Sequence, residues 1–270
     1  MNYDRRRVQL VCESELLNQY NIDLSLNKDI KKLPSIIPTT QFLNSLKSVL
    51  PDDIRDYYFK GLLSFCEAII SFNNKGYSWA TVKLYYSVFY FLRAEMLTRN
   101  TILVRSSGGG PLYRLTLNTA ARFVCLTDRA GNSDHKGTIQ HFQQLYKSVD
   151  PILSGQISGV ESYDWLIERR EQVNYRERLF HEPSHPSFWS GPVSMLQSNN
   201  MESLILLYLN DQYVYSFLPD HAIVSLPIKR LQNTAGVFKL YGLSQMLTED
   251  QKEFLRELLP IPALYPFYDL

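Results

Sequence analysis

The densest chemistry in the sequence lies within residues 164–189, where Arg176 and His181 are separated by four residues. A guanidinium holds a phosphate by charge and hydrogen bonds, and an imidazole can transfer a proton near neutral pH. At this spacing the two side chains could converge on a phosphodiester, with His181 as general acid or base. The alternative is a solvated helix face whose charged residues form ion pairs, each contributing about 0.2–0.5 kcal/mol.

The segment that carries these residues predicts a helix over about residues 164–179. It contains neither glycine nor proline, and it is rich in residues that favour helix. Four arginines and three glutamates crowd the helix, so much of its surface is charged. Pro183 and Pro186 follow, and we expect them to end the helix at or before His181.

Metal chemistry has less support in this sequence. His181, Glu182 and His185 are close enough to share a metal ion, but no further ligand cluster accompanies them. His135 and His141 are six positions apart, which places them on different faces of a helix. The sequence also lacks GxSxG, HExxH and dinucleotide-binding patterns. We therefore expect no metal site and no cofactor.

The composition narrows the class of protein. The 270 residues carry a net charge of +1, which excludes a strongly basic nucleic-acid coat protein. Eighteen tyrosines and fourteen phenylalanines are many for this length and hint at subunit contacts. Three cysteines without a CxxC pair fit a reducing cytosol. Without a signal-peptide pattern or an apolar run of about 20 residues, we expect a cytoplasmic protein with no membrane contact.

Two neighbouring segments predict the structural centre of the chain. The first begins at Pro51, and apolar residues then recur every three or four positions as far as Phe72. The second covers about residues 78–100, begins with Ser78 as a possible N-cap, and is apolar on nearly all sides. The short turn between them predicts an antiparallel helix pair.

The other elements and the domains are predicted from the same kinds of pattern. Residues 101–105 and 112–117 alternate as a hairpin does. We expect a strand at 8–11, helices at 40–50, 120–126, 134–149, 195–215 and 248–259, an extended stretch at 217–228, and a tail after Pro260 that docks on its own domain or on a neighbour. The expected domains are an N-terminal extension at 1–50, a helical bundle at 51–190 and a helical and extended region at 191–270 that packs on the bundle.

Three short motifs resemble a known family, the HEPN domain. Residues 85–90, read as Tyr-Tyr-Ser-Val-Phe-Tyr, and the following Leu92-Arg93-Ala94 are similar to its Tyr-Tyr-x-x-Phe helix. His135-Lys136-Gly137 ahead of Phe142 resembles its third helix. Residues 166–175, with Arg169, Arg170, Asn174 and Tyr175, are similar to the final helix of the family's non-nuclease branch. The resemblance covers about residues 52–180. It implies a mainly α fold, a HEPN-like antiparallel helical bundle with a small β-hairpin and a C-terminal mixed extension.

The same resemblance gives Arg176 and His181 a possible role. In the nuclease branch of the family, an arginine, a polar residue, three further residues and a histidine form the catalytic string, and residues 176–181 match it. In that role Arg176 would hold the scissile phosphate, and His181 would move the proton for attack by the ribose 2′-hydroxyl without a metal. The string departs from the family pattern at Glu177, which repels phosphate, and at Pro183, which places His181 at a helix end.

We therefore carry three hypotheses. The first is a HEPN-fold subunit of a prokaryotic toxin or anti-phage defence system. It would bind protein partners in a multi-subunit complex or homodimer, with RNA as a further option, through Arg169, Arg170, Arg178 and Tyr175. The second is a metal-independent endoribonuclease that uses Arg176 and His181. The third is a small-ligand sensor built on Arg105 and the loop at 106–110.

Overall fold

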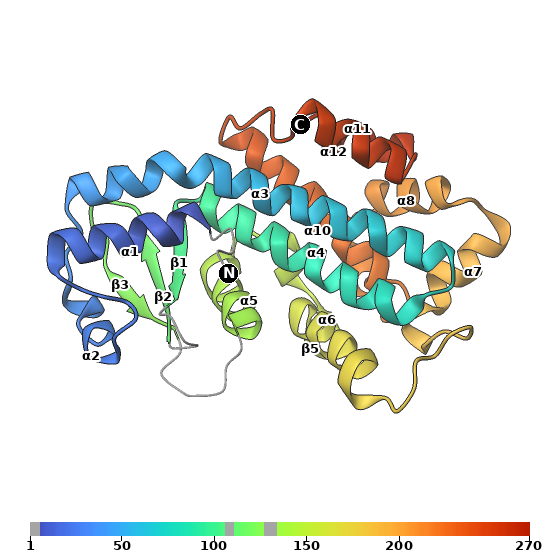
Figure 1. Ribbon diagram of the computed structural model, residues 1–270. Coiled ribbons are helices and arrows are strands. Elements are labelled where there is room, and N and C mark those ends of the chain that lie inside the picture. The colour runs from blue at the N-terminus through green and yellow to red at the C-terminus, as the bar shows by residue number, and fades with distance from the viewer. Residues whose placement is uncertain (1–5, 106–110, 127–133) are drawn as a thin grey trace. The chain divides into compact units, whose positions relative to one another are not determined.

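The computed structural model describes residues 6–105, 111–126 and 134–270 (Figure 1). Most of these residues are helical, and a small antiparallel sheet accompanies the helices. The prediction of a mainly α fold with a small hairpin is thereby confirmed. The chain divides into two compact units, one formed by Met1–Asp56 and Arg93–Phe142 and the other by Tyr57–Leu92 and Gln143–Leu270. We call them unit 1 and unit 2.

Unit 1 contains the sheet. Strands β1 (Thr101–Arg105) and β2 (Leu112–Thr116) are antiparallel, with Thr101 opposite Thr116 and Arg105 opposite Leu112. This confirms the predicted hairpin, whose tip at 106–110 lies outside the described residues, as does the predicted polar turn at 127–133. The helix predicted at 120–126 is wrong, because β3 (Phe123–Cys125) pairs with β2 and buries Phe123. A three-residue partner strand is too short to leave a clear sequence period.

The strand predicted at 8–11 is also wrong, because helix α1 (Arg7–Tyr20) begins there. The Asp53 carboxylate accepts hydrogen bonds from the backbone amides of Arg7 and Val8 at 3.0 and 3.1 Å. These amides belong to the first turn of α1, which has no intrahelical partner for them. Asp53 therefore caps α1 from a distant part of the chain, as a local N-cap residue would do.

Helix α3 (Thr40–Asn73) corrects a third expectation, since it is one helix where two were predicted. Pro51 lies inside it. A proline removes one intrahelical hydrogen bond and disfavours a helix interior by about 3 kcal/mol. Phe42, Leu46, Leu50 and Ile54 are nonetheless all buried, so the apolar stripe runs through the proline and favours the continuous helix.

Helix α5 (Asp134–Tyr146) begins in unit 1 and ends in unit 2, and it confirms the helix predicted at 134–149, although it ends slightly earlier. Unit 1 also holds the short helix α2 (Asn27–Ile30) and a 3-10 turn at Leu33–Ser35. Helix α4 (Tyr77–Thr98) follows α3 after a short turn and, like α3, contributes residues to both units.

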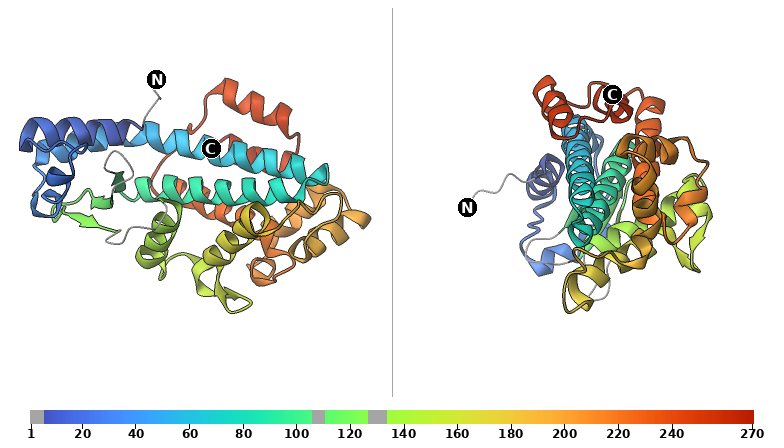
Figure 2. Two further views of the ribbon diagram at one scale, coloured as in Figure 1. Left: turned by 60° about the horizontal axis from the view of Figure 1, so that its bottom comes forward. Right: turned by 90° about the vertical axis from the view of Figure 1, so that its right-hand side faces the viewer.

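Within unit 2, α4 lies beside α3 in the antiparallel sense that the sequence predicts (Figures 1 and 2). The chain then forms a 3-10 turn (Pro151–Ser154), the two-stranded hairpin β4 (Gln156–Ile157) and β5 (Val160–Glu161), and α6 (Ser162–Glu171). Helix α6 continues as a π-helical turn (Gln172–Arg176). The helix predicted to reach about residue 179 therefore ends at Arg176, and Glu177 is extended.

The C-terminal elements of unit 2 differ from the prediction in two places. The single helix expected at 195–215 is three helices, α7 (Ser190–Ser198), α8 (Met201–Asn210) and α9 (Val214–Phe217). The stretch expected to be extended at 217–228 enters α10 (Ala222–Leu240), which contains Pro227. Nearly all residues of the first two turns of α10 are buried, and this packing outweighs the loss of one backbone hydrogen bond.

The end of the chain agrees with the prediction. Helix α11 (Glu249–Leu258) begins with a capping box in which the Thr248 hydroxyl and the Gln251 side chain each accept a backbone amide. A 3-10 turn (Pro262–Leu264) and α12 (Tyr265–Tyr268) complete the tail. The Tyr58 hydroxyl donates to the Phe267 carbonyl at 2.8 Å, and the Tyr268 hydroxyl lies 3.2 Å from the Cys66 sulfur. The tail therefore docks on α3, within its own chain.

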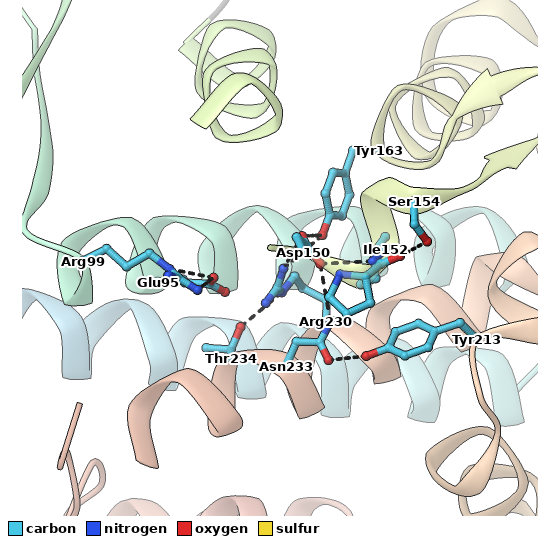
Figure 3. Close-up of polar contacts among 11 residues, drawn as sticks. Glu95, Arg99, Asp150, Ile152, Ser154, Tyr163, Tyr213, Arg230, Asn233 and Thr234 are labelled. Atoms are coloured by element: carbon cyan, nitrogen blue, oxygen red, sulfur yellow. Dashed lines mark hydrogen bonds and ion pairs between the residues drawn. The ribbon is translucent and has the colours of Figure 1, made fainter. Parts of the chain in front are cut away.

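A buried polar network anchors the start of α6 (Figure 3). The Asp150 carboxylate accepts hydrogen bonds from the Arg230 guanidinium at 2.7 Å and from the Tyr163 hydroxyl at 2.8 Å. Arg230 also donates to Tyr163 at 3.1 Å and to Thr234 at 3.2 Å. Because Tyr163 lies in the first turn of α6, the network fixes that helix relative to α10.

Candidate functional site

The site is built on α6, whose sequence gives it two different faces. Tyr163, Trp165, Leu166 and Ile167 are buried, and the arginines lie at the edge of this apolar surface. An arginine in such a position can place its aliphatic stem and planar head on aromatic rings.

Arg170 does this on α4. Its guanidinium carbon lies 5.2 Å from the Tyr85 ring centre and 6.0 Å from that of Tyr86. The Tyr175 ring in the π-helical turn approaches the same guanidinium to 5.1 Å. Distances up to about 6 Å allow favourable cation–π contact. The tyrosine-rich and arginine-rich segments are thus direct neighbours within unit 2.

The rings around Arg170 belong to a larger surface. Between Tyr77 and Tyr90 of α4, only Trp79, Lys83, Tyr86 and Tyr90 are not buried, and this spacing places them along one side of the helix. The rings of Tyr86 and Tyr90 stack at 6.1 Å, and the Trp79 ring contacts that of Phe180 at 6.0 Å.

Several members of this surface are strongly exposed for their type. Trp79 is 53% exposed, Phe180 54% and Tyr175 68%. We call the surface formed by Trp79, Phe180, Tyr175, Tyr86, Tyr90 and Arg170 the aromatic-arginine face. A gathering of large exposed apolar groups marks interaction sites on proteins.

Arg176 and His181 both lie next to this face, and each is engaged by a carboxylate. The Arg176 guanidinium donates to Glu171 at 2.7 Å on the surface. His181 lies beyond the helix, with its Nε2 atom 2.7 Å from a carboxylate oxygen of Glu177. Partial burial would raise the pKa of Glu177, but the contacts with His181 and Gln172 outweigh it and lower that pKa.

These pairings limit what the two residues can do as they stand. A phosphate that used both Arg176 and His181 would have to displace Glu171 and Glu177, which carry charge of its own sign. The Arg176–Glu171 contact is the exposed ion pair expected of a solvated charged surface, whereas the contacting atoms of His181 and Glu177 are buried.

The other two predicted binding arginines lie in different settings. The Arg169 guanidinium covers the buried rings of Trp165 and Phe188, at 5.4 and 5.7 Å from their centres. Arg178 is exposed in the bend that follows the π-helical turn, beside the aromatic-arginine face. Arg170, Arg178 and Tyr175 thus contribute to that face or its edge, whereas Arg169 points to a separate part of unit 2.

The His181 to His185 segment has a structural role that the sequence did not indicate. One carboxylate oxygen of Glu182 accepts the Ser78 backbone amide at 2.6 Å, and the other accepts the Ser78 hydroxyl at 3.0 Å. Glu182 thereby caps the first turn of α4, and the N-cap expected of Ser78 comes from elsewhere in the chain. The His185 ring packs edge-on against Tyr77 at 5.5 Å, and Trp189 donates to Thr81 at 2.9 Å.

This anchoring explains how the exposed groups are held. Glu182 and Trp189 fix residues 182–189 to α4 at both ends, and the half-exposed Phe180 lies two residues before Glu182. Within the described part of the chain, no group of three or more His, Cys, Asp or Glu side chains is arranged to hold a metal ion.

Comparison with family models, with curated proteins and with solved structures finds no match to this chain. Among the described residues, no helix has both the length and the apolar character needed to cross a bilayer.

Proposed function

We propose that this chain is a HEPN-fold subunit of a prokaryotic toxin or anti-phage defence assembly, and that it acts by binding a partner protein. The observation that carries the proposal is the contact between Arg170 and Tyr85, at 5.2 Å. It joins two of the three segments on which the family resemblance rests. The resemblance requires a bundle in which these two segments are neighbouring helices.

The binding surface is the aromatic-arginine face. Protein interfaces are enriched in tyrosine, tryptophan, phenylalanine and arginine, and their central rings contribute much of the binding energy. Trp79 and Phe180 are suited to such a central position, because both rings are large and half exposed and they contact each other. The capping of α4 by Glu182 holds Phe180 in place before a partner arrives, which lowers the ordering cost of binding.

The partner should present apolar side chains to the rings and an acidic group to the edge of the face. Arg178 is exposed there, and no ion pair of Arg178 occurs within the described part of the chain. An acidic residue of a partner could therefore pair with it and fix the orientation of the complex.

The test combines a native pull-down with measurement of the oligomeric state. Proteins encoded beside this gene are co-expressed with the tagged chain, and complexes are weighed by light scattering after gel filtration. We expect a complex of defined stoichiometry, weakened at least tenfold by Trp79→Ser or Phe180→Ser. Phe254→Ser is the matched control, because Phe254 is a similarly exposed ring on α11. A monomeric protein that captures no partner would remove the basis of the proposal.

The endoribonuclease is the second candidate. It is favoured by the placement of Arg176 and His181 on a single short segment, where the Arg176 side chain is exposed. In this alternative, substrate binding would release the two side chains from their carboxylates.

A further inference from the structure

Unit 2 contains a cavity that the proposed function does not use. Its volume is about 480 Å³, and it lies between α6, the turn of the β4–β5 hairpin, the chain around the start of α7 and the loop before α10. Cavities of about 300–1,000 Å³ are typical of sites for small molecules or single side chains.

The apolar wall of the cavity is formed by Trp165 and Phe188, which are both buried. Their rings meet edge to face with centres 6.2 Å apart. The Arg169 guanidinium already covers both rings, so this wall holds one planar cation from the chain itself.

The charged groups that line the cavity are two carboxylates and one guanidinium. Glu168 pairs with Arg169 at 3.3 Å, so these two charges offset each other. Asp220 remains, with its side chain half exposed and its carboxylate 3.9 Å from the Nε2 atom of His221. Burial lowers the pKa of His221 and outweighs the opposing effect of Asp220, so this imidazole is neutral at pH 7. The cavity therefore carries one uncompensated negative charge at Asp220.

The uncharged polar groups add hydrogen-bond acceptors. Ser158 and Ser187 line the cavity and are exposed, and a hydroxyl oxygen can accept an N–H from a ligand. Because Glu168 and Arg169 offset each other, the remaining charge is that of Asp220, and a cation with several N–H donors finds both an opposite charge and acceptors.

We propose that this cavity binds a guanidinium group, which pairs with Asp220 while the exposed hydroxyls of Ser158 and Ser187 accept its other N–H groups. A guanidinium suits the site better than a compact ammonium because its planar fork can use both oxygens of a carboxylate. The group can belong to a free small molecule or to an arginine side chain of another protein. The experiment separates these two sources.

The full-length chain is titrated by calorimetry with three probes. The first is N-acetyl-arginine amide. The second is N-acetyl-citrulline amide, which has nearly the same shape without the charge. The third is the pentapeptide Gly-Gly-Arg-Gly-Gly, which presents arginine within a chain. We expect saturable binding of an arginine probe and at least tenfold weaker binding of the citrulline probe. Preference for the free amide indicates a small molecule, and preference for the pentapeptide indicates a protein side chain.

Variants locate the binding within the cavity. Asp220→Asn should weaken the arginine probe at least tenfold, and Glu253→Gln, which removes a charge from α11, should leave it unchanged. The comparison of arginine with citrulline uses the unaltered chain, so it holds even where a variant fails to fold. Absence of saturable binding of both arginine probes, equal binding of citrulline, or binding that Asp220→Asn leaves intact overturns the proposal.

Discussion

The Arg230 guanidinium lies 2.7 Å from the Asp150 carboxylate, and both side chains are almost completely buried. Two charges removed from water are tolerated only when they are paired and their remaining hydrogen bonds are satisfied. Tyr163 and Asn233 supply further partners to Asp150, and Thr234 supplies one to Arg230. The pair therefore connects α10 to the chain that leads into α6.

Loss of one partner should destabilise the fold strongly. We expect Arg230→Met to lower the free energy of unfolding by roughly 3–5 kcal/mol, because the Asp150 charge then remains buried without its cation. Urea denaturation followed by circular dichroism measures the change. Lys147→Ala is the control, since Lys147 pairs with Glu161 at 3.2 Å on the surface and should cost at most about 1 kcal/mol. Equal, small effects of the two changes would contradict the role given to the buried pair.

The sequence predicted those elements that are stabilised by residues close together in the chain. The burial of α4, the β1–β2 hairpin and the Thr248 cap follow from residues adjacent in sequence, and the structure has all three. Helix α1 could not be predicted in the same way, because its cap, Asp53, lies 45 residues from Val8.

The two internal prolines illustrate a second limit. Pro51 and Pro227 both read as breaks in sequence, yet each lies inside a helix, since burial along the rest of the helix outweighs the lost hydrogen bond. Contacts between distant residues limited the prediction of the candidate site as well.

The sequence shows that Arg176 and His181 are close in the chain, but it does not show that Glu182 caps α4 at Ser78, 104 residues away.

The three cysteines should differ sharply in reactivity. Cys12 and Cys66 are buried, and burial raises the pKa of both thiols, that of Cys66 to about 12. The reactive form of cysteine is the thiolate, so neither should react in the native protein. Cys125 is exposed on β3.

We expect one equivalent of a thiol reagent such as dithionitrobenzoate to be consumed at pH 8 without denaturant, and three in 6 M guanidinium chloride. Cys125→Ser should abolish the native reaction and leave two equivalents after denaturation. Rapid native labelling of Cys66 would show that the tail containing Tyr268 does not cover it as the structure describes.

His221 should make the stability of the protein depend on pH. The ring is enclosed by Tyr208, whose hydroxyl lies 2.9 Å from Nδ1, and by Tyr215, whose ring centre lies 4.7 Å away, with Asp220 at 3.9 Å from Nε2. Burial lowers the pKa of His221 below its ordinary value of 6.5, and Asp220 only partly opposes this.

The unfolded chain therefore binds a proton to this residue at a higher pH than the folded chain does. The stability contributed by neutral His221 is fully present above about pH 6.5 and is lost as the pH falls from there toward the lowered pKa. Urea denaturation at pH 7.5 and 5.5 measures the loss, which should be smaller in His221→Gln. An identical loss in the variant would assign the effect to other groups.

Arg170 should matter through its planar head as well as its charge. It contacts Tyr85, Tyr86 and Tyr175 within 6.0 Å. We expect Arg170→Ala to lower the free energy of unfolding by roughly 1–2 kcal/mol. Arg170→Lys should recover only part of this, because an ammonium cannot stack on three rings at once.

Arg178→Ala serves as the matched control on the same segment. Its side chain is exposed, so the change should alter stability by no more than about 0.5 kcal/mol. If Arg170→Lys were as stable as the unaltered chain, Arg170 would stabilise the fold through its charge alone and not through its planar head.

Arg176 and His181 decide between the binding module and the endoribonuclease. Both are engaged by carboxylates at 2.7 Å, and a phosphate would have to displace these before it met either side chain. We therefore expect the purified chain to leave single-stranded and structured RNA intact in the presence of EDTA, and Arg176→Ala and His181→Ala to bind the partner protein as the unaltered chain does.

The carboxylates themselves supply the sharper test of the alternative. If the residues were catalytic and held inactive by their pairs, Glu171→Gln and Glu177→Gln should release them and increase EDTA-resistant cleavage. That cleavage should then disappear in Arg176→Ala and His181→Ala, because neither the phosphate contact nor the proton transfer would remain. Cleavage with this dependence would establish the endoribonuclease. RNA left intact by the carboxylate variants as well would leave Arg176 in a surface ion pair and His181 in a contact with Glu177, beside a protein-binding face.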